Sequence, residues 1–213
     1  MSAPSPSLSF SSKELRDLAL AWIALGLAFA IFFAGGGQRA VTGILRGGIV
    51  GPLLLSLLTA GMGFLLHEVA HKVVAVRFGQ VAEFRADYGM LFLAVVSALA
   101  GFIFAAPGAV HHRGRLTRRE HGLIALAGPA TNIVLAVVFL PVFFVGLLVN
   151  SEFVALAGSR GLTINLFLAT FNMLPFGPLD GKTVLGWSKT AFAAFFVPSV
   201  VLTIGAFVVG FGF

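Results

Sequence analysis

The chain has 213 residues, of which 58% are hydrophobic and only 10% are charged, and its mean hydropathy is +1.01. A water-soluble domain of this size could not cover so much apolar surface, so the composition predicts a polytopic membrane protein. The net charge of +6 comes from basic residues in short loops between apolar runs, which indicates membrane topology and excludes a nucleic-acid-binding surface. No cysteine is present, so a metal site would have to use His, Asp or Glu.

Residues 1–17 are expected to form a disordered N-terminal segment on the cytoplasmic side, because residues 1–10 are rich in Ser and Pro. At its end, Ser11 and Glu14 have the spacing of a capping box and predict the start of a helix. Residues 18–213 are predicted to be a single integral-membrane domain. Its first span is expected at residues 18–34, followed by a glycine-rich loop at residues 38–48.

Apolar runs and one alternating segment account for the rest of the chain. Residues 81–88 alternate apolar and charged residues, as a short strand near the membrane interface does. The predicted fold class is therefore an all-α polytopic membrane protein with about five to six transmembrane helices, a re-entrant segment and short interfacial β-strands. The later spans are expected at residues 49–66, 123–149, 162–179 and 190–213, with a basic, polar stretch at 111–121.

The apolar segment at residues 90–106 decides the topology. If it spans the membrane and the N-terminus is cytoplasmic, the 14 Lys and Arg residues show no bias toward either side. If it turns back, only Arg39, Arg46 and Arg160 lie outside, as the positive-inside rule favours. We therefore predict a re-entrant segment whose irregular backbone is shielded by protein.

Two histidines and a glutamate follow the second predicted span. On a helix, His67 and His71 share one face because they are four residues apart, and Glu68 lies about 100° around the axis. Two imidazoles can bind one tetrahedral cation while the carboxylate acts as a general base, and zinc suits these ligands. Polar residues near a helix end would be the simpler explanation, but ionisable groups beside a membrane span are rare without a partner or a function.

Asp180 is the predicted third ligand. In the five-span topology the helices that carry His67 and Asp180 both run from outside to inside, so the side chains reach similar depth near the cytoplasmic side. Pro178 to Gly181 could form an interfacial turn without any metal. Beside two histidines at the same depth, a ligand is favoured, and two histidines with one carboxylate leave a position for water.

The motifs together resemble the site-2 protease family of intramembrane zinc metalloproteases, in its compact archaeal form. They are His-Glu-x-x-His at 67–71, Ala-Gly-Pro-Ala-Thr-Asn at 127–132 and Asn-Met-Leu-Pro-Phe-Gly-Pro-Leu-Asp-Gly at 172–181. The resemblance covers residues 49–185. It implies that His67, His71 and Asp180 bind one zinc ion and that Glu68 is the general base.

The same resemblance places Asn172 near the substrate or the developing oxyanion. Two interpretations stay open for Asn132: its amide faces the cleft, or it forms a hydrogen bond to a neighbouring helix. We expect no appended PDZ or CBS domain. His111, His112 and His121 lie among four arginines and are predicted to be surface residues, because like charge opposes cation binding.

The predicted function is hydrolysis of peptide bonds in or near transmembrane segments of membrane proteins. The expected partners are a transmembrane-helix substrate and the lipid bilayer, with no nucleic acid. The cell membrane is the expected location. The alternatives are a membrane metal transporter, which should carry polar residues across the bilayer, and a non-catalytic helix-binding homologue of the protease.

Overall fold

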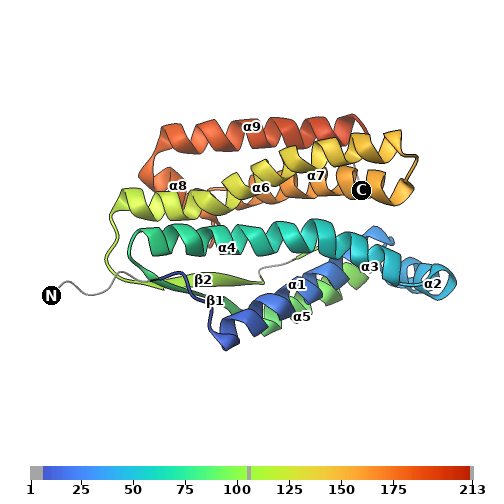
Figure 1. The fold of residues 1–213 in the computed structure, drawn as a ribbon, viewed down its shortest axis with the longest axis horizontal. Helices are drawn as coiled ribbons and strands as arrows, with labels where there is room; N and C mark the ends of the chain where they lie inside the picture. The colour runs from blue at the N-terminus through green and yellow to red at the C-terminus, as the bar shows by residue number, and fades with distance from the viewer. Residues whose placement is uncertain (1–6, 105–106, 212–213) are drawn as a thin grey trace.

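The computed structural model describes residues 7–104 and 107–211, and its helices are arranged on both sides of α4 (Figure 1). Helices α6, α7 and α9 lie on one side of α4, whereas α1, α5 and a two-stranded sheet lie on the other. The elements are α1 Ser12–Phe33, α2 Gly37–Gly47, α3 Val50–Ser56, the π-helical turn η1 Leu57–Gly61, α4 Met62–Arg77, β1 Val81–Ala86, α5 Tyr88–Leu99, β2 Gly108–Arg113, α6 Arg118–Leu148, α7 Glu152–Asn172, α8 Asp180–Trp187 and α9 Lys189–Val208.

Within residues 7–104 and 107–211, five helical segments are long and apolar enough to cross a membrane. They are α1, the continuous run from α3 to α4, α6, α7 and α9. The molecule is thus a multi-pass membrane protein, and the predicted fold class is confirmed. The exposed apolar side chains on these helices belong against lipid, where they need no protein partner.

Several predicted boundaries are wrong. The expected loop at 38–48 is the amphipathic helix α2, which follows a break at Gly35 and Gly36, both with positive φ. The second span continues beyond His71 to Arg77, so the two histidines lie within a helix rather than at its end. The span expected at 162–179 instead begins at Glu152 and ends at Asn172, because Ser151 caps its first turn.

The segment at 90–106 does not cross the membrane as a helix. Helix α5 has 12 residues and a length of about 18 Å, shorter than the roughly 30 Å hydrocarbon core. Strand β2 then pairs antiparallel with β1, with Phe84 opposite Val110. The chain therefore returns to the strand it left, as predicted for a re-entrant segment; residues 105–106 lie outside the described residues. Strand β2 begins at Gly108 and ends at Arg113, inside the start of the expected polar stretch; short interfacial strands were predicted, but the position of this one was not.

A π-helical turn precedes the metal-binding motif. Its Leu57 carbonyl accepts a hydrogen bond of 3.1 Å from the Trp22 indole of α1. Gly61 lies directly against the same indole, because an added Cβ would come within 2.7 Å of Trp22 Cδ1. Helix α1 is therefore fitted closely against the segment that leads into α4.

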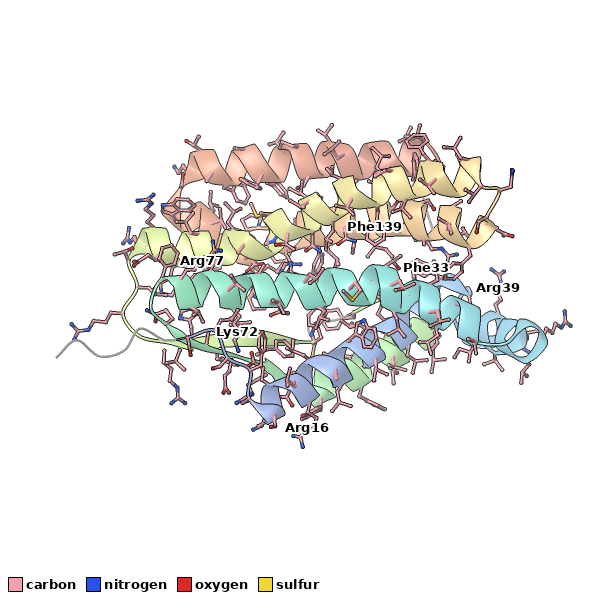
Figure 2. The ribbon with its side chains drawn as sticks, in the orientation of Figure 1. Arg16, Phe33, Arg39, Lys72, Arg77 and Phe139 are labelled. Atoms are coloured by element: carbon pink, nitrogen blue, oxygen red, sulfur yellow. The ribbon has the colours of Figure 1, made fainter. Side chains whose placement is uncertain are left out.

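The start of α1 is fixed to α4 by a buried ion pair. Ser11 caps the helix as predicted, but the Glu14 carboxylate turns inward to Lys72 and to the Phe84 amide of β1, so the predicted capping box is only half formed. Glu14 is 0% exposed and Lys72 1% exposed. Figure 2 labels Lys72 on the side of α4 that faces the strands and the start of α1. Residues 12–17 are helical, so the expected disordered segment is wrong there, and residues 1–6 lie outside the described residues.

Candidate metal centre

The structure brings the three predicted metal ligands together. Asp180 Oδ2 lies 3.2 Å from His67 Nε2 and 3.3 Å from His71 Nε2, and the two Nε2 atoms are 2.9 Å apart. Tetrahedral coordination with bonds of about 2.0–2.1 Å places ligand atoms roughly 3.3–3.4 Å apart. The observed triangle therefore has nearly the dimensions that a zinc ion requires, and these three residues form the one metal-binding group found among the described residues.

Hydrogen bonds assign the tautomer of both histidines. His67 Nδ1 lies 2.6 Å from Asn132 Oδ1, and His71 Nδ1 lies 2.7 Å from the Ile124 carbonyl. A carbonyl oxygen can only accept, so His71 donates from Nδ1 and its Nε2 carries a lone pair. The side-chain oxygen of Asn132 likewise accepts a hydrogen bond from His67 Nδ1, so His67 Nε2 also carries a lone pair. Two imidazole lone pairs and a carboxylate then converge, and a cation relieves their repulsion.

Two glycines make room for this arrangement. A Cβ on Gly128 of α6 would lie 2.4 Å from His67 Nε2 and 2.5 Å from His71 Nε2. A Cβ on Gly181 would lie 2.0 Å from the Met173 carbonyl oxygen. Glycine is required at both positions because any side chain would enter the ligand triangle or separate the start of α8 from the end of α7.

Hydrophobic packing holds Asp180 in place. Asp180 is the first residue of α8, and a buried side chain of α8 packs against α6 and the residue that follows α7. This cluster consists of Ala125, Leu126, Met173 and Val184. The third ligand therefore reaches the histidines through packing of α8 against α6 and the end of α7, contacts between segments that are far apart in the sequence.

Glu68 lies beside the triangle but is not part of it. Its carboxylate is buried and faces the backbone amide of Val110 in β2. Phe84 lies opposite Val110 in the sheet, and its backbone N–H points away from β2 and donates a hydrogen bond to the Glu14 carboxylate. Phe84 and Val110 therefore form a non-hydrogen-bonded pair, in which the backbone N–H groups of both residues point away from the partner strand. The Val110 N–H thus lies on the outer edge of β2, and this edge faces the site. Glu68 can therefore accept a proton at the metal site without occupying a ligand position.

Named relatives match the chain over much of its length. It is 37% identical over 195 residues to a putative zinc metalloprotease of Methanocaldococcus jannaschii, MJ0611, and the match covers 90% of this chain and 93% of that protein. The chain belongs to the site-2 protease family.

Two further relatives carry the same name. Putative zinc metalloprotease YwhC of Bacillus subtilis is 33% identical over 150 residues, which are 60% of this chain and 66% of YwhC. Putative zinc metalloprotease Rip3 of Mycobacterium tuberculosis is 34% identical over 148 residues, 68% of this chain and 32% of Rip3. No family model and no solved structure matches the chain. The relatives' names support a zinc metalloprotease built on membrane helices.

The two predicted asparagines of this site-2 protease lie in different surroundings. Asn132 is fully buried and bonds to His67 and to Asn165 of α7, which fits the second of the two interpretations, a hydrogen bond between helices. Asn172 ends α7 and donates from Nδ2 to the Leu168 carbonyl, 3.0 Å away, on its own helix. A role for Asn172 at the substrate stays a prediction.

Three contributors to the site in this site-2 protease were missed in the sequence. Gly128 lay within a recognised motif, but nothing in the sequence revealed that it faces the histidines. Asn165 is a polar residue inside an apolar span, and that was a usable signal. The Val110 amide could not have been found, because a backbone group has no signature in the sequence.

Proposed function

We propose that this chain is an intramembrane zinc endopeptidase that cleaves peptide bonds in or beside transmembrane segments of other membrane proteins. The observation that carries the proposal is the triangle of His67, His71 and Asp180 with Glu68 beside it, buried among membrane-spanning helices. The names of the relatives support zinc as the ion and proteolysis as the reaction. We place the site toward the cytoplasm, because the five-span topology leaves three of the 14 basic residues outside.

The residues divide the chemistry between them. His67, His71 and Asp180 would hold the ion, which when bound supplies Lewis acidity that activates water and polarises a carbonyl. Glu68 takes a proton from the attacking water and returns it to the leaving amine. The Val110 amide holds the Glu68 carboxylate in position for both transfers. Burial among helices excludes bulk water, which strengthens each of these electrostatic interactions.

The substrate backbone has to be exposed before it can be cleaved. In a transmembrane helix the carbonyls are bonded within the helix, so the substrate segment must unwind locally. Strand β1 has its outer edge covered at Phe84 by Glu14 of α1. The outer edge of β2 runs beside Glu68, so β2 is the strand we propose for pairing with the unwound segment.

Reconstitution of the full chain with single-span protein substrates tests the function. We expect the wild-type chain to cleave at least one substrate, and the Glu68→Gln variant to retain zinc while cleavage falls by at least 100-fold. Glu152→Gln is the matched control, since Glu152 is exposed in the first turn of α7. Zinc flux across the vesicle without any cleavage would reject the proposal in favour of a metal transporter. Helix binding that Glu68→Gln leaves unchanged, again without cleavage, would favour a non-catalytic homologue.

A further inference from the structure

A chain of buried hydrogen bonds connects the His67 ring to α7. Asn165 Nδ2 donates to the Gly161 carbonyl at 2.8 Å, and Asn165 Oδ1 accepts from Asn132 Nδ2 at 2.8 Å. Asn132 Nδ2 also donates to the Gly63 carbonyl at 3.1 Å, and Asn132 Oδ1 lies 2.6 Å from His67 Nδ1. These hydrogen bonds therefore join α4, α6 and α7, and they reach α4 at Gly63, one helical turn before His67.

The direction of this chain is fixed by backbone carbonyls. The carbonyls of Gly161 and Gly63 only accept, so both asparagine amides must turn their nitrogen toward them. If Asn132 were flipped, its oxygen would face the Gly63 carbonyl and the oxygen of Asn165. The Asn132 oxygen is therefore left for His67, and His67 has to carry its proton on Nδ1.

Burial makes the network costly to disturb. Asn132 and Asn165 are both 0% exposed, and His67 is 4% exposed. Gly63 permits the close approach, because an added Cβ would lie 2.7 Å from Asn165 Oδ1. In such surroundings an unpaired amide cannot turn to water, so the oriented pair keeps one arrangement.

We propose that Asn132 and Asn165 are positioning residues that fix the orientation and tautomer of His67, so that its Nε2 lone pair faces the metal. This inference rests on the proposed zinc site. His71 provides an internal reference, because the Ile124 backbone carbonyl holds its Nδ1 and no side-chain substitution can remove that partner. The asparagine pair therefore acts on His67 and leaves His71 in place. Neither asparagine needs to touch the substrate.

The proposal is tested by measuring two properties of the purified full chain. One is its zinc affinity, measured by competition with a chromophoric chelator, and the other is its melting temperature, which reports structural damage. Asn132→Leu removes the acceptor, and we expect it to weaken zinc binding by about 10- to 100-fold. Asn165→Leu leaves the Gly63 carbonyl as the one remaining acceptor for Asn132 Nδ2. This variant should weaken zinc binding by a smaller factor than Asn132→Leu. Asn132→Asp keeps an acceptor for His67 but faces two other oxygens. It should lower the melting temperature while zinc affinity stays within about threefold of wild type.

Thr163→Val is the matched control. Thr163 is 0% exposed on α7, and its hydroxyl bonds to the Ser159 and Phe211 carbonyls, away from the ligands. This variant should lower the melting temperature without changing zinc affinity. Zinc affinity that simply follows the melting temperature through all four variants, or wild-type affinity in Asn132→Leu, would overturn the positioning role. A wild-type chain that binds zinc but cleaves no substrate would reject the proposed function and leave this inference intact.

Discussion

The substitution Gly128→Ala adds one methyl group to α6 directly against the two histidine ligands. The new carbon would lie 2.4 Å from His67 Nε2 and 2.5 Å from His71 Nε2, whereas unbonded heavy atoms need about 3.5 Å. At least one ring must therefore move by about 1 Å. Alanine is the better helix former by about 1 kcal/mol, so a loss of function could not be assigned to helix propensity.

The size of the effect follows from the tolerance of metal coordination. Zinc–ligand distances vary by about 0.2 Å, so a displacement of about 1 Å removes one ligand. Zinc sites with four protein ligands bind with roughly 10–16 kcal/mol, or about 2.5–4 kcal/mol for each ligand. Each 1.4 kcal/mol is a factor of ten in affinity. We therefore expect Gly128→Ala to bind zinc about two to three orders of magnitude more weakly than wild type.

The assay measures the zinc content and zinc affinity of the purified chain, together with substrate cleavage. Gly26→Ala is the matched control, because its added Cβ would approach the Leu57 side chain to the same 2.4 Å in a buried helix contact that holds no ligand. The control should retain zinc, while Gly128→Ala should lose both zinc and cleavage. A Gly128→Ala protein with one tightly bound zinc and wild-type cleavage would refute the assignment of the triangle as the metal site.

Three further predictions concern stability. Glu14→Leu leaves the buried Lys72 ammonium without its carboxylate partner and should lower the free energy of unfolding by about 3–5 kcal/mol. The double variant Glu14→Leu with Lys72→Met should recover most of this loss. Equal melting temperatures for the single and the double variant would contradict this expectation. Burial lowers the pKa of His112 in the folded protein, and the neighbouring His121 and His111 lower it further. As the pH falls, His112 therefore takes up a proton in the unfolded chain at a higher pH than in the folded protein. The free energy of unfolding should thus decrease as the pH drops below about 6.5. His112→Asn should flatten that part of the pH–stability curve measured by thermal unfolding. Removing zinc with a chelator should lower the melting temperature, because three converging donors lose their cation, and added zinc should restore it.

The membrane-spanning architecture was predictable because it depends on local composition. Each span is an apolar run long enough for the bilayer, and that property is visible within about 20 residues. The failures occurred where contacts outside a segment decide its structure. Glu14 had the spacing of a capping box, yet the buried Lys72 took its carboxylate. Strand β2 carries no clear alternation in its sequence and forms because β1 offers it a pairing edge.

The sequence by itself determined that His67, Glu68 and His71 share one turn of a membrane helix, because spacing along a helix is a local property. It also supplied Asp180 as a candidate ligand through topology and motif. Only the tertiary structure decided that Asp180 Oδ2 meets both imidazoles, that Gly128 leaves space between them, and that Asn165 reaches His67 through Asn132. These relations join helices far apart in the chain, and they arise from packing, which no single segment encodes.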